Sequence, residues 1–194
     1  MSLASGTMAF VAFVAFVVFV RPMVSGCGFC REEVRMDGQK LDLTALRDAT
    51  ASLDRALQTY AAIVAVDPQA LQTLGVPEIQ ETVRAGVVKN FEFVYELGTK
   101  MMRRYVHMEA EVPDEVAQWG FRDLLRHMAD RGLIDTVEAW FGYRTMRSIT
   151  ARAYEPEKAR AVCETAHALL RDTKALIAQL ALRAEGTESA LAQQ

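Results

Sequence analysis

The chain is poor in cysteine, proline and histidine, with three, five and three residues among 194, and its formal net charge is only −3. Three cysteines cannot build a disulfide scaffold, and the Cys27–Cys30 pair has no second pair or histidine cluster nearby to complete a zinc site. No strand–helix–strand unit, which a redox motif would need, surrounds that pair. We therefore interpret both as incidental thiols and Cys163 as a core residue.

The small negative charge argues against a nucleic-acid binder of the simple electrostatic kind, so any contact with a nucleotide or RNA has to be local. Hydrophobic residues make up 51% of the chain and charged residues 24%, which is typical of a folded globular domain. The scarcity of proline and of alternating strand-like patterns after residue 36 predicts an all-α protein. No cofactor and no metal are expected, because a di-metal bundle would need Glu-x-x-His motifs on two facing helices, and the sequence offers no such pair of motifs.

Apolar residues recur at helical spacing in five segments bounded by caps and helix breakers. The predicted helices run from Asp42 or Thr44 to Asp67, from about Glu78 to Met108, from Phe121 to Gly132, from Asp135 or Thr136 through Ile149, and from Pro156 past Leu180. Short connections favour antiparallel neighbours. We therefore expect an up-and-down antiparallel bundle of about five helices over residues 36–186, followed by a flexible tail at residues 187–194.

The N-terminal extension, residues 1–35, has a different character. Met8–Val20 is an uncharged apolar run. As a helix it would span about 20 Å, short of the roughly 30 Å hydrocarbon core of a bilayer. Extending it back to residue 3 just reaches across, so a membrane anchor over residues 3–20 is one interpretation.

Two other interpretations of this extension stay open. Val24–Cys27 resembles a bacterial lipobox and would indicate export, but no Lys or Arg precedes the apolar run, and Arg21-Pro22 interrupts the path to the cysteine. The third interpretation is that translation starts at Met36, which makes the preceding segment a mis-assigned start or a dispensable extension. We favour this one, and it predicts a cytoplasmic protein.

Residues 91–105 alternate large aromatic residues with carboxylates and end in a basic cluster. On a helix they form two stripes. One stripe is aromatic and apolar: Phe91, Tyr95, Met102 and Tyr105. The other is charged, at a spacing of four: Glu92, Glu96 and Lys100. The pattern alone favours an amphipathic core helix with a solvated charged face.

The segment Arg84–Lys100, Arg-Ala-Gly-Val-Val-Lys-Asn-Phe-Glu-Phe-Val-Tyr-Glu-Leu-Gly-Thr-Lys, resembles the signature helix of the nucleotidyltransferase substrate-binding protein family, a branch of the HEPN all-helical domains. The resemblance covers most of residues 41–182. Leu41–Leu57 is similar to the family's opening helix, and Phe121–Asp135 and Val137–Trp140 fall at its third helix and the start of its fourth. It marks six residues as a family-specific surface or core: Arg84, Phe91, Glu92, Tyr95, Glu96 and Lys100.

This resemblance implies a compact HEPN-like bundle, usually a homodimer, that pairs with a minimal nucleotidyltransferase encoded nearby. The pair is generally discussed as a toxin–antitoxin module. The nucleotidyltransferase carries the catalytic carboxylates, and the helical subunit is thought to present the substrate or to be the modified target. For this chain the resemblance implies a non-catalytic substrate-binding or regulatory partner. A membrane-tethered helical interaction module is an alternative.

The fourth predicted helix departs from the family pattern. The family typically has Arg-Asn followed by Ser/Thr-His-Thr-Tyr, and many HEPN domains use this R-x4-H arrangement for RNA cleavage. Arg147 and Tyr154 match, but Ser148 replaces the asparagine and Arg152 stands at the position of the histidine. A guanidinium cannot act as a general base at usable pH. The degenerate cleft therefore disfavours the alternative of a metal-independent HEPN ribonuclease toxin.

The arginines of this region, Arg144, Arg147 and Arg152, lie among tyrosines. Arginines interleaved with aromatic residues are suited to binding a nucleotide phosphate or an RNA backbone without cleaving it. The alternative is a charged helix face whose arginines pair with Glu92 or Glu96 across the bundle. The two interpretations do not exclude each other, because buried arginine–carboxylate pairs also hold elements in register.

Overall fold

The computed structural model describes residues 41–66, 76–152 and 155–191, and these ranges are helical and contain no strand. All of them belong to a compact unit, Met36–Gln194. The helices are α1 (Thr44–Val64), α2 (Val76–Glu109), α3 (Pro113–Ala117), α4 (Phe121–Asp130), α5 (Val137–Ile149), the 3₁₀ turn η1 (Thr150–Arg152) and α6 (Pro156–Leu191). The predicted all-α class is confirmed.

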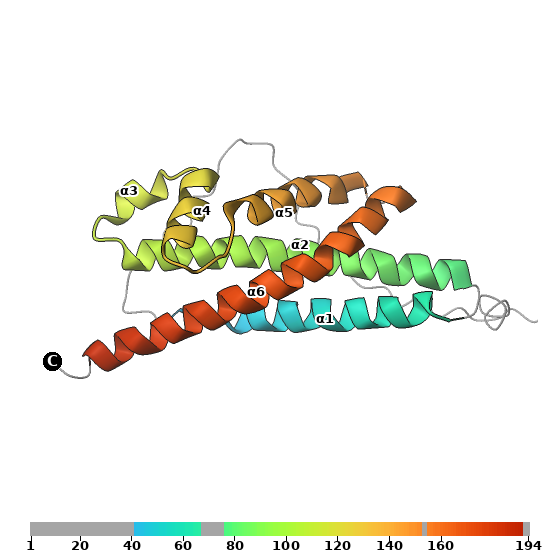
Figure 1. The fold of residues 1–194 in the computed structure, drawn as a ribbon, viewed down its shortest axis with the longest axis horizontal. Coiled ribbons are helices and arrows are strands. Elements are labelled where there is room, and N and C mark those ends of the chain that lie inside the picture. The colour runs from blue at the N-terminus through green and yellow to red at the C-terminus, as the bar shows by residue number, and fades with distance from the viewer. Residues whose placement is uncertain (1–40, 67–75, 153–154, 192–194) are drawn as a thin grey trace, which may run out of the picture. The chain divides into compact units, whose positions relative to one another are not determined.

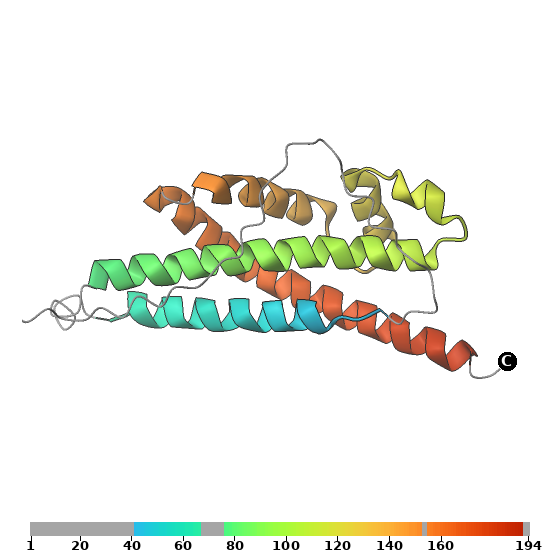
Figure 2. The ribbon, with the colours of Figure 1, turned by 180° about the vertical axis from the view of Figure 1, so that it is seen from behind.

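Helix α2 lies at the centre of the bundle. It packs most extensively against α1 and α6, and it also contacts α3, α4 and α5. In both views α1 and α5 lie on opposite sides of α2 and run antiparallel to it, while α6 crosses the bundle obliquely (Figures 1 and 2). This is the up-and-down arrangement expected from the short connections.

The core follows the predicted apolar stripes. Phe91, Met102 and Trp140 are fully buried, with 0%, 0% and 1% of their surface exposed. Cys163 lies in the same core at 2% exposure, as predicted, and burial raises the pKa of its thiol to about 11. Because other helices pack on opposite sides of α2, more of its circumference is buried than in a helix that packs against neighbours on one side only.

Local sequence signals set the helix ends. The N-cap of α1 is Leu43 and not the predicted Asp42 or Thr44, and the Asp42 carboxylate, one residue earlier, accepts a hydrogen bond from the backbone N–H of Thr44 at 2.9 Å. Gly132 adopts a positive φ of 65° just after α4. The N–H groups of Gly132 and Leu133 donate to the carbonyls of Ala129 and Met128, so α4 ends in the predicted glycine cap, a Schellman motif.

Two details differ from the sequence prediction. Pro113 was expected only to break the helical pattern, whereas it begins α3, because a proline at the first helical position needs no N–H partner. Helix α6 continues past Gly186 to Leu191, beyond the predicted end.

Among the described residues, no helix is both long enough and apolar enough to cross a membrane. The apolar run within residues 3–20 and the Cys27–Cys30 pair lie outside the described residues.

The two glycines within α2 have different surroundings. A Cβ atom added at Gly98 would lie 3.3 Å from Cη2 of Trp140, whereas nothing lies within 4 Å of one added at Gly86. Trp140 is enclosed by the core and cannot withdraw freely. Gly98 is therefore the point where the indole of α5 approaches the backbone of α2.

We expect Gly86→Ala to raise the free energy of unfolding by up to about 1 kcal/mol, because alanine is the better helix former. Gly98→Ala gains the same propensity but compresses Trp140, so we expect it to be neutral or destabilising. Urea denaturation of both variants at pH 7 measures the difference. Equal stabilisation by the two substitutions would show that the Gly98–Trp140 contact imposes no constraint.

Candidate functional site

Arg147, in the last turn of α5, joins that helix to α2. Its Nε and Nη2 donate to Oε1 of Glu96 at 2.9 and 2.6 Å, and its Nη1 lies 3.2 Å from Oε1 of Glu92. The two carboxylates are four residues apart and therefore lie on one face of α2, where a single guanidinium reaches both. The hydrogen bond with Glu96 raises the pKa of Arg147. The pairing that the sequence left open is thus present.

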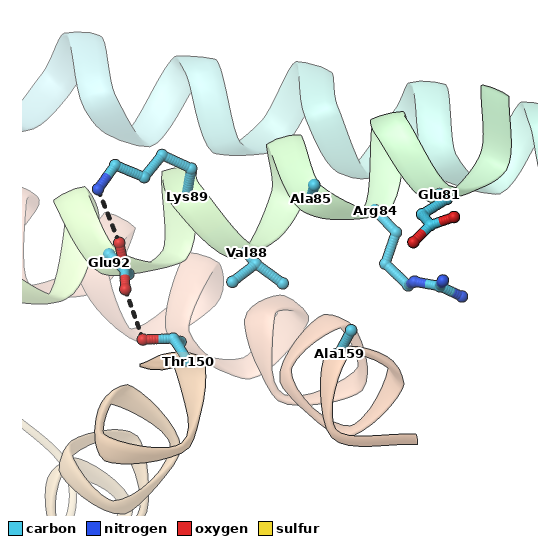
Figure 3. Close-up of a pocket in the computed structure, with 8 residues that line it drawn as sticks. All are labelled: Glu81, Arg84, Ala85, Val88, Lys89, Glu92, Thr150 and Ala159. Atoms are coloured by element: carbon cyan, nitrogen blue, oxygen red, sulfur yellow. Dashed lines mark hydrogen bonds and ion pairs between the residues drawn. The ribbon is translucent and has the colours of Figure 1, made fainter. Parts of the chain in front are cut away.

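Glu92 is the most enclosed charge of this cluster, with 14% of its side chain exposed. Thr150, the buried first residue of η1, donates its hydroxyl to Oε1, and Lys89 donates to Oε2 at 2.9 Å (Figure 3). Burial alone would raise the pKa of Glu92. The hydrogen bonds from Thr150 and Lys89 and the charge of Arg147 outweigh burial and lower it. Glu92 is therefore a fixed anion at neutral pH.

A surface pocket of about 350 Å³ opens beside this cluster, between α2, η1 and α6. Figure 3 shows charged residues at both ends of it, with Glu81 and Arg84 at one end and Lys89 and Glu92, beside Thr150, at the other. The remaining lining residues are small or apolar: Ala85, Val88 and Ala159. Because Glu92 is already bound on both oxygens, Arg84 and Lys89 are the groups that can offer hydrogen bonds to an anion in this pocket.

The family-signature residues divide between core and surface. Phe91 and Tyr95 belong to the core, with 0% and 8% exposure. Arg84 lines the pocket and is half-buried, whereas Lys100 is exposed farther along α2. The aromatic part of the signature therefore builds the fold, and two of its charged residues, Glu92 and Glu96, bind Arg147.

The three predicted phosphate-binding arginines do not form one patch. Arg144 places its guanidinium 4.8 Å from the ring centroid of Phe121 on α4, whereas Arg147 binds α2. Three residues along a helix leave two side chains about 60° apart around the axis, which is enough to direct them to different neighbours. Arg152 is exposed at the end of η1, and Tyr154 lies outside the described residues.

Sequence reasoning did not select Lys89 or Thr150. Lys89 stands three residues before Glu92, a spacing that brings side chains together on a helix, so a signal was available. Thr150 carried no such signal, because its role depends on η1 packing against α2.

The side chains around Arg147 offer groups that can bind an anion. The side chains offer a guanidinium, an ammonium, a hydroxyl and carboxylates, and no histidine is among the described residues that line the pocket. Arg152 occupies the position where the R-x4-H arrangement has its histidine. The site can hold an anion beside α2, and no imidazole is present there to serve as a general base.

We expect Glu92→Gln to lower the free energy of unfolding by about 1–3 kcal/mol, because it weakens enclosed, charge-assisted hydrogen bonds. Glu96→Gln is the matched control, since the Glu96 side chain is 53% exposed. A pair this exposed contributes at most about 1 kcal/mol. Urea denaturation at pH 7 compares the two. Equal losses of unfolding free energy in the two variants would contradict the conclusion that Glu92 contributes more to stability than Glu96.

The effect of Glu92→Gln on stability should also depend on pH. The pKa of Glu92 is lowered from its ordinary value of 4.5, so the stability added by its ionised form is present above that value and is lost as the pH falls through the lower, folded-state pKa. The stability difference between the parent chain and Glu92→Gln should be constant between about pH 7 and 5 and shrink at more acidic pH. If the stability difference persisted at acidic pH, the loss caused by Glu92→Gln would come from altered packing and not from the lost charge.

Comparison with known proteins identifies the family of the chain. Residues 41–182 match the family described as nucleotidyltransferase substrate binding protein like. The chain is 41% identical over 105 residues to a Haemophilus influenzae protein named "Probable ribonuclease HepT", covering 54% of this chain and 72% of that protein. It also resembles the solved structure of HI0074 from Haemophilus influenzae, described as having the fold of a substrate binding domain of a nucleotidyltransferase. The TM-score is 0.63 at 34% identity, covering 72% of this chain and 98% of HI0074. The chain belongs to the nucleotidyltransferase substrate-binding protein-like family.

Proposed function

We propose that this chain is the non-catalytic substrate-binding or regulatory partner of a minimal nucleotidyltransferase, as a homodimer in a two-gene module of the toxin–antitoxin type. One observation carries the proposal. Arg147 is neutralised by Glu92 and Glu96, and Arg152 takes the place of the histidine that cleavage would need. A site that can bind but has no imidazole suits presenting a substrate, or being the modified target, better than cutting RNA.

The pocket beside Arg147 supports the binding part of this proposal. Arg84 and Lys89 provide hydrogen-bond donors at its two ends, and the Glu92–Thr150 pair holds η1 against α2 at the Lys89 end. Phosphate oxygens are the natural ligands of such donors. The family name supports a nucleotidyltransferase as the partner that would supply or use such a phosphate.

A metal-independent ribonuclease is the second candidate, and the name of the 41% identical relative favours it. In that mechanism an arginine stabilises the phosphate and a histidine moves the proton. This chain retains Arg147 and replaces the histidine with Arg152. The second candidate therefore requires a proton-transfer group from elsewhere.

The partner proposal predicts a stable complex. Tagged full-length chain, co-expressed with its neighbouring reading frames, should purify with a small nucleotidyltransferase in a fixed ratio, measured by size-exclusion light scattering and mass spectrometry. A homodimer that carries no nucleotidyltransferase would contradict the proposal. Incubating the complex with α-labelled ATP then separates the two roles, because the label ends on this chain if it is the target and on another molecule if it presents the substrate.

The catalytic argument predicts the behaviour of Arg152→His. The parent chain should not cleave RNA, whereas Arg152→His should gain cleavage by about 100-fold or more over the parent, the contribution typical of a positioned general base. The double variant Arg152→His/Arg147→Ala is the control and should lose the gain. The readout is gel electrophoresis of an end-labelled RNA. Cleavage by the unaltered chain at the level of the variant would overturn the non-catalytic assignment.

A further inference from the structure

A second pocket, of about 310 Å³, lies on the α4–α5 face and shares no residue with the one beside Arg147. Its lining combines arginines, an aromatic ring and one carboxylate: Arg122, Arg126, Val137, Glu138 and Phe141. Arg122 and Arg126 are one helical turn apart on α4, so both guanidinium groups reach the same pocket.

Cations and rings alternate along this face. The Arg122 guanidinium lies 5.3 Å from the centroid of the Phe141 ring, and Phe141 meets Phe121 edge to face at 5.5 Å. The Arg144 guanidinium then lies 4.8 Å from Phe121. A guanidinium over an aromatic ring is attracted by the negative face of the ring, and its N–H groups can still donate hydrogen bonds to a ligand.

Among the described residues, Arg122, Arg126 and Arg144 have no carboxylate partner, unlike several other arginines. Several arginines are held in ion pairs: Arg131 with Glu109, Arg147 with Glu92 and Glu96, and Arg171 with Asp172. Within the ranges that the structure describes, no ion pair or hydrogen bond engages Arg122, Arg126 or Arg144. Although the net charge of the chain is −3, the α4–α5 face therefore carries three arginines without carboxylate partners next to aromatic side chains.

We propose that the α4–α5 face is a binding site for a nucleoside phosphate, either as a free nucleotide or within single-stranded RNA. Arg122 and Arg126 bind the phosphate, and Phe141 provides the surface for a base. Glu138 accepts a hydrogen bond from a base amino group or a ribose hydroxyl. An acidic peptide would match the charge but would leave the stacking surface unused. This binding belongs to the chain alone and needs no nucleotidyltransferase, so it can fail or succeed independently of the proposed partnership.

The test is fluorescence anisotropy of the full chain with a 5′-fluorescein-labelled hexa-adenylate RNA, with AMP and the unlabelled RNA as competitors. The double variant Arg122→Gln/Arg126→Gln should bind about tenfold more weakly or worse. The slope of log K against log salt should be less steep by about 1.4, for two lost phosphate contacts on a single strand.

The charge-matched control is Arg47→Gln/Arg55→Gln. Both residues are exposed on α1, on the other side of α2 from α5 (Figure 1). This control should bind the RNA as the parent does. Phe141→Leu keeps an apolar side chain but removes the ring, and it should weaken binding roughly fivefold or more at a temperature where the variant is folded. If Phe141→Leu does not fold, the arginine variants decide alone.

Competition by AMP would identify a free nucleotide as sufficient, and competition by the unlabelled RNA alone would identify the strand; either result supports the proposal. Unchanged RNA binding by Arg122→Gln/Arg126→Gln would overturn it, as would an equal loss in the α1 control. The proposal would also be overturned if Arg122→Gln/Arg126→Gln no longer bound a partner protein but still bound RNA, because the face would then be a protein-docking surface.

Discussion

The contact between Trp140 and Gly98 determines how α5 lies on α2, and the candidate site depends on that register. The indole approaches the backbone of α2 at Gly98, where no side chain stands in its way. Seven residues farther along α5, Arg147 arrives over Glu92 and Glu96, which precede Gly98 on the antiparallel α2. A steric contact in the core thereby positions an electrostatic cluster at the surface.

Helix α5 separates two kinds of positive charge. Arg147 faces α2 and is neutralised by carboxylates, so it stabilises the junction between helices and holds Thr150 and η1 in place. Arg144 faces α4 and stacks on an aromatic ring, with its charge left available. Arginines so close in the sequence therefore have different roles, because the helix directs one toward acidic neighbours and the other toward phenylalanine.

Much of the fold could be predicted from local patterns. Apolar periodicity identified α1, α2, α4, α5 and α6, and Gly132 and Pro156 marked the end of α4 and the start of α6, because these signals depend only on neighbours in the chain. The short helix α3 was missed because a proline after an acidic loop reads equally as a break and as a first helical position.

The candidate site was predicted only in part, for a physical reason. Periodicity placed Glu92 and Glu96 on one face of a helix and Arg147 on another helix, since such placement follows from spacing along each helix alone. Which charges meet, whether Arg144 joins them, and how Thr150 reaches Glu92 depend on packing between segments far apart in the chain. The sequence by itself thus determined the helices, their apolar faces and the missing histidine. Only the tertiary structure decided which arginines are neutralised and which remain available to a ligand, because that depends on the neighbour each side chain finds across the bundle.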